Sequence, residues 1–210
     1  MKKTMILLFI ASFFAFSCKK EDKKEDTPKP NPNPITFVNF IKLNNQWDYN
    51  YFVNDVQGTD QTWKIIEMLN NGYCKVRLSM GSYTNVHYWY ANASIFSDEK
   101  FSNPPNNHFA LLKNNASLND EWQINYVDEG QECTMTRKVE AFNETITVDA
   151  GTYVCTKIKE TVSDDPNIID YYWINKDVGI VQRQLTGWYD EGNGRVYFQQ
   201  KLKLKNVLLN

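Results

Sequence analysis

The stretch Tyr73-Cys74-Lys75-Val76-Arg77-Leu78-Ser79-Met80 decides the fold class. Its even-numbered positions are apolar and its odd-numbered positions are mostly polar. Alternation with a period of two is typical of a strand with one face in a core and the other in water. Asn71-Gly72 precedes the stretch and Gly81-Ser82 follows it, and such pairs supply the positive φ angles of hairpin turns. The stretch therefore predicts antiparallel strands joined by tight hairpins.

The same alternation recurs along the chain, and further glycine turns separate the segments. Strands are predicted near residues 46 to 53, 61 to 69, 73 to 80, 83 to 92, 121 to 127, 132 to 142, 144 to 149, 152 to 161, 168 to 175, 179 to 188 and 194 to 205. Residues 97 to 120 are expected to form a long connection with a short helix around His108 to Lys113. The predicted fold is all-β, an antiparallel meander that forms a curved, half-barrel-like sheet.

A weak internal sequence repeat indicates that the sheet consists of two repeated halves, at about 41–96 and 116–188. Leu43–Tyr51 recurs as Leu118–Tyr126, with Leu, Asn, Trp, Asn and Tyr shared in register, and Tyr88-Trp89 corresponds to Tyr172-Trp173 further on. The offset grows along the chain, as loop insertions between repeated strands would produce. We expect Trp47 to superpose on Trp122 and Trp89 on Trp173. The alternative is coincidence in a chain rich in Asn, Tyr and Trp.

The first residues have the layout of a secretory signal. Lys2 and Lys3 precede an apolar run from Met5 to Phe16, which is too short to span a bilayer as a helix. Ala15-Phe16-Ser17-Cys18 resembles a bacterial lipobox, which implies that residues 1–17 are a signal peptide and that Cys18 carries the acyl chains. Two or more chains hold a protein stably on a membrane. The alternative is an ordinary signal peptide cleaved near a chance cysteine.

Residues 18–34 are expected to form a tether between the lipidated Cys18 and a single β-domain at 35–210. Mixed charges over residues 19–26 and alternating prolines up to Pro34 cannot build a core. The acidic residues after Cys18 resemble the export signals of Bacteroidota surface lipoproteins. This resemblance implies an outer-membrane lipoprotein that is surface-exposed or, as the alternative, periplasmic.

Composition excludes several classes of function. Residues 35–210 hold 16 Lys and Arg against 21 Asp and Glu, so an acidic domain without basic clusters is not expected to bind nucleic acid. With two His and four Cys in the chain, we predict no metal site and no cofactor. Of the cysteines after Cys18, Cys133 and Cys155 could form a disulfide, or all three could be packed thiols.

Signatures of catalysis are also missing, so we predict no catalytic residue. His87 and His108 have no partner at a useful spacing. Asp164-Asp165 is expected to be a pair of loop acids rather than glycosidase carboxylates, and Asp190–Gly194 to be a hairpin turn rather than a calcium loop.

Several segments carry a family resemblance. Val148–Cys155, Tyr172–Ile174 and Val178–Val181 resemble the second half of uncharacterised Bacteroidota lipoproteins. More distantly, the chain is similar to the LolA-like fold of lipoprotein carriers, which implies a curved sheet whose concave face can hold acyl chains. The chain departs from that pattern at Asn44 and Asn119, near the place of a strand-opening glycine, and in having no amphipathic lid helix.

Repeated aromatic residues are the remaining functional signal. A concave face could collect them for stacking against apolar ligands or sugar rings, or they could simply fill the core. The candidate ligand-binding residues are Trp89, Trp173, Tyr88, Tyr172, Trp47 and Trp122. The leading hypothesis is a lipid-anchored, non-enzymatic envelope protein that binds an apolar or glycan ligand or a partner protein. The alternatives are a structural or assembly module of the envelope without a pocket and, third, a glycan-acting enzyme.

Overall fold

A computed structural model of the chain describes residues 40–99, 109–128, 131–163, 165–190 and 194–210. No α-helix occurs among these residues, and hence none of the apolar length that spanning a membrane requires. The strands are β1 (Gln46–Val53), β2 (Val56–Gln57), β3 (Gln61–Met68), β4 (Tyr73–Met80), β5 (Tyr83–Ala91), β6 (Ile95–Glu99), β7 (Ala110–Lys113), β8 (Glu121–Asp128), β9 (Gln131–Val148), β10 (Gly151–Val162), β11 (Ile169–Asn175), β12 (Gly179–Asp190) and β13 (Arg195–Leu208). The predicted signal peptide and tether lie outside the described residues.

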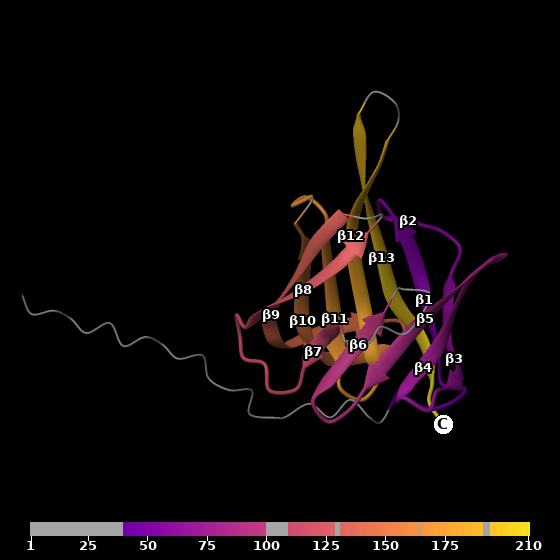
Figure 1. The fold of residues 1–210 in the computed structure, drawn as a ribbon. Helices are drawn as coiled ribbons and strands as arrows, with labels where there is room; N and C mark the ends of the chain where they lie inside the picture. The colour runs from indigo at the N-terminus through magenta and orange to yellow at the C-terminus, as the bar shows by residue number, and fades with distance from the viewer. Residues whose placement is uncertain (1–39, 100–108, 129–130, 164, 191–193) are drawn as a thin grey trace, which may run out of the picture.

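The described strands form one antiparallel sheet. Its order is β7-β6-β5-β4-β3-β1-β13-β12-β11-β10-β9-β8, with the short β2 paired to β1. The chain makes one meander from β1 to β7 and a second from β8 to β13, and pairing of β1 with β13 joins the two meanders (Figure 1). This topology confirms the predicted all-β antiparallel meander.

The sheet is curved but not closed, because its edge strands β7 and β8 do not pair through their backbones. Side chains connect these edges instead. Trp122 on β8 donates a hydrogen bond from Nε1 to the carbonyl oxygen of Ala110 on β7, at 2.7 Å. Arg137 on β9 donates from Nη1 to the carbonyl oxygen of Phe109, at 2.6 Å. The curved, half-barrel-like sheet is therefore confirmed, and side-chain contacts define its seam.

Both meanders open with the same local structure. Asn44 before β1 and Asn119 before β8 have φ angles of 69° and 68°. In the first meander Asn44 N–H donates to Ile65 O, and Ile65 N–H donates to Asn45 O. The second meander repeats these two bonds, at 2.9 and 3.0 Å, with Asn119, Val139 and Asp120. The sequence repeat at these two positions therefore corresponds to a structural repeat.

The left-handed backbone at the exposed Asn119 predicts different outcomes for two substitutions. Asn119→Gly should leave the free energy of unfolding unchanged or slightly raised, because glycine adopts a positive φ without a steric penalty. Asn119→Ala should lower it by about 1 kcal/mol, because Cβ crowds the following carbonyl in this conformation. Urea unfolding of both variants measures the difference. Equal stability of the two would contradict the assigned conformation.

Further along the repeat, the hydrogen-bonded ladders show which residues are equivalent. Cross-strand pairing leads from Ile65 on β3 through β4 to His87 on β5. The equivalent path leads from Val139 on β9 through β10 to Tyr172 on β11. Tyr172 therefore occupies the place of His87, and Trp173 occupies the place of Tyr88.

The expected superposition of Trp89 on Trp173 is thus wrong. Trp89 lies on the concave face, two residues from His87, whereas Trp173 lies on the opposite face, where Lys157 Nζ is 5.2 Å from the centre of its ring. A shift of one residue along a strand moves a side chain to the other face of the sheet. The Tyr-Trp part of the sequence repeat therefore reflects composition, whereas Trp47 and Trp122 are both buried and both follow the shared opening.

The connection expected at residues 97–120 also differs from the prediction. Its described parts include β6 and β7 rather than a helix around Lys113, and His108 lies outside the described residues. Ala110, Leu111 and Leu112 on β7 are all buried. A strand that is buried on both faces shows no alternation, so its sequence did not indicate a strand.

An aromatic cluster fills one end of the concave face. Trp89 lies 5.0 Å from Trp47 and 5.8 Å from Trp63 between ring centroids, and Phe40 packs edge-on against the same cluster. Gly179 makes room for Phe40, since a Cβ at this position would lie 3.1 Å from its ring. The cluster therefore fills the concave face beside Val178 and Gly179.

Candidate functional site

A groove of about 400 Å³ lies on the concave face, toward the end from which the β12–β13 hairpin projects (Figure 1). We call it the mouth groove. Strands β1, β3, β4 and β5 line one side and β12 and β13 the other, so both meanders contribute. Trp63, Leu78, Met80, Leu185 and Leu202 supply its apolar lining. Its polar residues include Gln61, His87 and Arg183.

Arg183 is held in the groove by Asp170 on the neighbouring strand β11. Its Nε lies 2.9 and 3.0 Å from the two carboxylate oxygens, and its Nη2 donates to Oδ2 at 2.5 Å. The side chains of Arg183 and Asp170 are 14% and 2% exposed. Burial alone would lower the pKa of Arg183, but the Asp170 carboxylate raises it well above its usual value. The guanidinium therefore stays protonated in a partly dehydrated site.

Tyr172 completes this part of the site. Its hydroxyl donates to Asp170 Oδ2 at 2.8 Å, and the Arg183 guanidinium lies 5.2 Å from the centre of its ring. Burial raises the pKa of Tyr172 well above its usual value, so the phenol is neutral and acts as a donor. The tyrosine and the aspartate together fix the orientation of the arginine.

His87 is held in a similar way on the other side of the groove. Its Nδ1 lies 3.3 Å from Asp98 Oδ1, which also accepts a 2.9 Å hydrogen bond from Trp89 Nε1. The His87 ring packs on Trp63 with 5.8 Å between centroids. Each of the two polar residues at the bottom of the groove thus has a buried carboxylate behind it.

A second buried pair of arginine and carboxylate lies farther along the concave face. Arg137 donates from Nε to Glu160 Oε2 at 2.7 Å, and both side chains are almost completely buried. A smaller cavity of about 220 Å³ lies between this pair and the mouth groove, and Leu185 lines both cavities. Charged pairs and apolar walls therefore alternate along the concave face.

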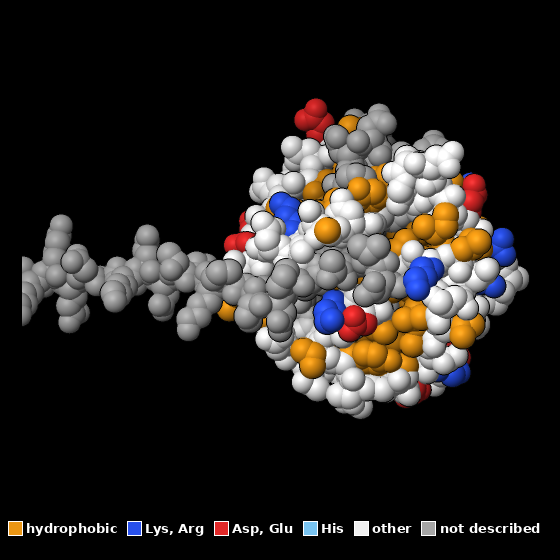
Figure 2. Space-filling model, turned by 90° about the horizontal axis from the view of Figure 1, so that it is seen from below, with side chains coloured by type: hydrophobic (Ala, Val, Ile, Leu, Met, Phe, Trp, Pro, Cys, Tyr) orange, Lys and Arg blue, Asp and Glu red, His pale blue; other side chains and the backbone are white. Residues whose placement is uncertain are grey.

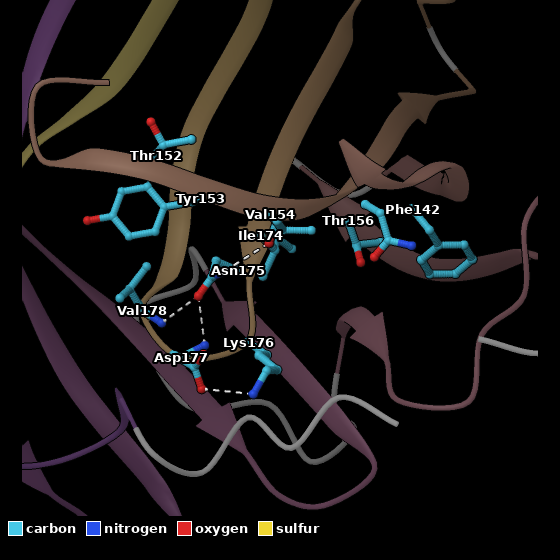
Figure 3. A pocket seen from close by; sticks show the side chains of 11 residues that line it. Phe142, Thr152, Tyr153, Val154, Thr156, Ile174, Asn175, Lys176, Asp177 and Val178 are labelled. Carbon is cyan, nitrogen blue, oxygen red and sulfur yellow. Dashed lines mark hydrogen bonds and ion pairs between the residues drawn. The ribbon is translucent and has the colours of Figure 1, made fainter. Parts of the chain in front are cut away.

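A second cavity of about 520 Å³ lies at the opposite end of the sheet, beside the β11–β12 turn (Figure 3). Asn175 organises this turn: its Oδ1 accepts from the N–H of Asp177 and Val178, and its Nδ2 donates to Val154 O. Lys176 and Asp177 pair with each other at 3.2 Å. At this end of the molecule apolar patches are visible between polar side chains (Figure 2). The cavity combines apolar side chains such as Phe142 and Ile174 with polar ones such as Thr152 and Thr156.

Comparison with protein families supplies the classification. Residues 48–193 match a family described as DUF3108-like. The chain belongs to the DUF3108-like family. The predicted membership of an uncharacterised family is confirmed at this level. No curated protein and no solved structure is significantly similar to the chain.

The region shared with the DUF3108-like family contains most of the mouth groove, including His87 and Arg183. Gln200 and Leu202, which β13 contributes, lie beyond the matched residues. The two groove residues with buried carboxylate partners therefore belong to the part of the chain that defines the family.

The aromatic residues predicted to bind a ligand are all buried in this DUF3108-like protein. Trp47, Trp89 and Tyr172 are at most 1% exposed, and Trp122, Trp173 and Tyr88 are 7–9% exposed. None of the six lines the mouth groove or the second cavity. Cys18 lies outside the described residues. The groove is lined instead by Tyr51, Trp63 and Tyr83, which sequence reasoning did not select as ligand-binding residues.

Other residues singled out from the sequence have structural contacts. Asp165 accepts a 2.5 Å hydrogen bond from Arg195, as a loop acid would, whereas Asp164 lies outside the described residues. Residues 191–193 of the supposed hairpin turn also lie outside them. Cys74, Cys133 and Cys155 are free and buried, and burial raises the pKa of Cys74 and of Cys155 to about 12. The three cysteines are therefore packed thiols rather than a disulfide, and Cys74 and Cys155 are protonated.

Two functional candidates were missed because their partners are distant in sequence. His87 was interpreted as structural for lack of a spaced partner, yet Asp98 meets it across the β5–β6 hairpin. Arg183 and Asp170 meet across β11–β12. The available signal was a charged residue at a core-facing position of an alternating strand, which requires a buried partner.

Proposed function

We propose that this DUF3108-like protein is a lipid-anchored, non-enzymatic protein of the cell envelope that binds a small apolar or amphipathic molecule in the mouth groove. The observation that carries the proposal is the combination of apolar walls with two oriented polar side chains, His87 and Arg183, in one concave site. Specific small-molecule sites typically have such a lining, with volumes of about 300–1,000 Å³. A binding role fits better than catalysis because the described side chains that line the groove include no Ser, Thr, Cys, Asp, Glu or Lys to act as a nucleophile or general acid beside His87.

The sequence features outside the described residues support the location. The lipobox-like Cys18 and the tether up to Pro34 favour attachment to the outer membrane, with the β-domain facing the cell surface or the periplasm. The resemblance to Bacteroidota lipoproteins and, more distantly, to LolA-like carriers agrees with a membrane-attached protein whose concave face binds an apolar or amphipathic molecule. A glycan or a partner protein remains a second class of occupant for the same face.

Metabolic labelling tests the anchor. Radiolabelled palmitate should enter the wild-type protein and should be absent from Cys18→Ala, because the thiol of this residue is the proposed attachment point. The variant should also leave the membrane fraction. Equal labelling of the two proteins would contradict the proposed anchor.

Titration with the neutral, environment-sensitive dye N-phenylnaphthylamine tests the groove. The chain from Cys18 onward, with Cys18→Ala and without the signal peptide, should bind the dye at one saturable site. Leu185→Trp should weaken binding at least about tenfold, because the larger ring fills the groove. Leu208→Trp is the matched control, since Leu208 is 56% exposed. Absence of saturable binding by the wild type would favour the structural or assembly module instead.

A further inference from the structure

We infer that the mouth groove binds an alkyl-chain amphipath head first, with an oxygen-bearing head on Arg183 and His87 and with the chain leading outward. This inference rests on the proposed function, because it assigns the chemistry and the orientation of the ligand in the same groove. The head is a carboxylate or a hydroxyl-ester group, as in a free fatty acid or a monoacylglycerol.

The depth of the groove residues supports this orientation. Trp63, Leu202 and His87 at its bottom are 1%, 6% and 7% exposed, whereas Tyr83 at its rim is 54% exposed. Along β12, buried Ile180 is followed on the concave face by Arg183 and then by Leu185 toward the hairpin. The two donors, His87 and Arg183, therefore lie deep in the groove beside Trp63 and Leu202, whereas Met80 and Leu185 lie nearer the rim with the more exposed Tyr83, Asn85 and Gln200. This arrangement places a head on the deep donors and the chain toward the rim.

Arg183 provides the main recognition group. Its Nε and Nη2 are engaged by Asp170, whereas Nη1 makes no hydrogen bond to any described residue. Arg183 lines the groove, so this nitrogen is the donor left for a ligand. A guanidinium prefers carboxylate and carbonyl oxygens and gains strength in a partly dehydrated site.

His87 provides a second polar contact. Asp98 accepts from the Nδ1 side of the ring, which leaves Nε2 for the groove. Because Asp170 already pairs with Arg183, the site recognises a head mainly by hydrogen bonding. A cationic head on the same chain would face the protonated Arg183 and could not accept a hydrogen bond from it.

Displacement of the dye by ligands with equal chains tests the inference. Decanoate, monodecanoin and decyltrimethylammonium carry an anionic, a neutral oxygen-bearing and a cationic head. At least one of the first two should displace the dye at a concentration about tenfold or more below that of the cation, as expected for a hydrogen bond to a charged donor. The better of the two identifies the head as a free carboxylate or as an ester.

Substitutions of Arg183 and His87 test whether these residues recognise the head group. Arg183→Lys should keep dye binding but lose the preference for an oxygen-bearing head, because lysine keeps the charge beside Asp170 without the forked donors. Arg195→Lys is a matched control, since Arg195 also pairs with an aspartate but does not line the groove. His87→Phe keeps the ring on Trp63 and should weaken the preference as well. Near-ultraviolet circular dichroism checks folding, and His87→Phe decides the matter if Arg183→Lys does not fold.

The possible results separate the two proposals. Saturable dye binding without head selectivity, or with selectivity that both groove variants retain, would overturn the head-first orientation and leave the proposed function intact. No dye binding by the wild type would overturn both. Head selectivity that is lost in the groove variants and kept in Arg195→Lys would support both.

Discussion

Replacement of Trp89 by alanine should lower the free energy of unfolding by about 3–5 kcal/mol, the usual cost of deleting a buried indole. Trp89 is fully buried, its ring contacts Trp47, Trp63 and Phe96, and its Nε1 donates to Asp98. The substitution would therefore leave a cavity in the cluster and remove one partner of a buried carboxylate. Unfolding in urea, followed by circular dichroism, measures the change.

Trp188→Ala is the matched control for this experiment. Trp188 lies half-buried on β12, where the Arg195 guanidinium is 4.1 Å from the centre of its ring. Its loss should cost clearly less, because solvent can fill the space. A similar loss of stability in the two variants would show that Trp89 is not the core residue described above.

Arg137→Met should also destabilise the protein by about 3–5 kcal/mol, because it leaves the buried Glu160 without its 2.7 Å partner. The double variant Arg137→Met/Glu160→Met should recover most of this loss, since an apolar pair of similar volume avoids the cost of burying charge. Recovery should be incomplete, because Arg137 also binds Phe109 O at the seam between the sheet edges.

Urea unfolding of the two single variants and the double variant forms a thermodynamic cycle. Additive losses in the double variant would show that Arg137 and Glu160 contribute independently. That result would contradict the buried pair as the source of the effect.

Most of the fold was predictable because hairpin sheets are encoded locally. Alternation over Tyr73–Met80 and the glycines at the turns give both strand positions and their connections. The strands predicted at 132–142 and 144–149 form the single strand β9, in which Asn143 has a φ of 56°. Asn44 and Asn119 are comparable, because asparagine takes the left-handed conformation that a glycine would otherwise supply.

The site was less predictable because it depends on register and on contacts between distant strands. The sequence Tyr172-Trp173 looks like Tyr88-Trp89, but cross-strand pairing shifts the match by one residue and reverses the faces. The six aromatic residues predicted to bind a ligand are buried core residues. The groove is instead marked by Arg183, a charged residue at an inward-facing position of β12.

Amide chemical-shift mapping by NMR, during titration of the unanchored chain with decanoate or monodecanoin, tests most directly whether the mouth groove is the binding site. The proposal predicts saturable shifts that cluster at His87, Arg183, Leu185 and Leu202, on strands from both meanders. Shifts confined to the second cavity around Asn175–Val178, or no saturable shifts with either ligand, would contradict it.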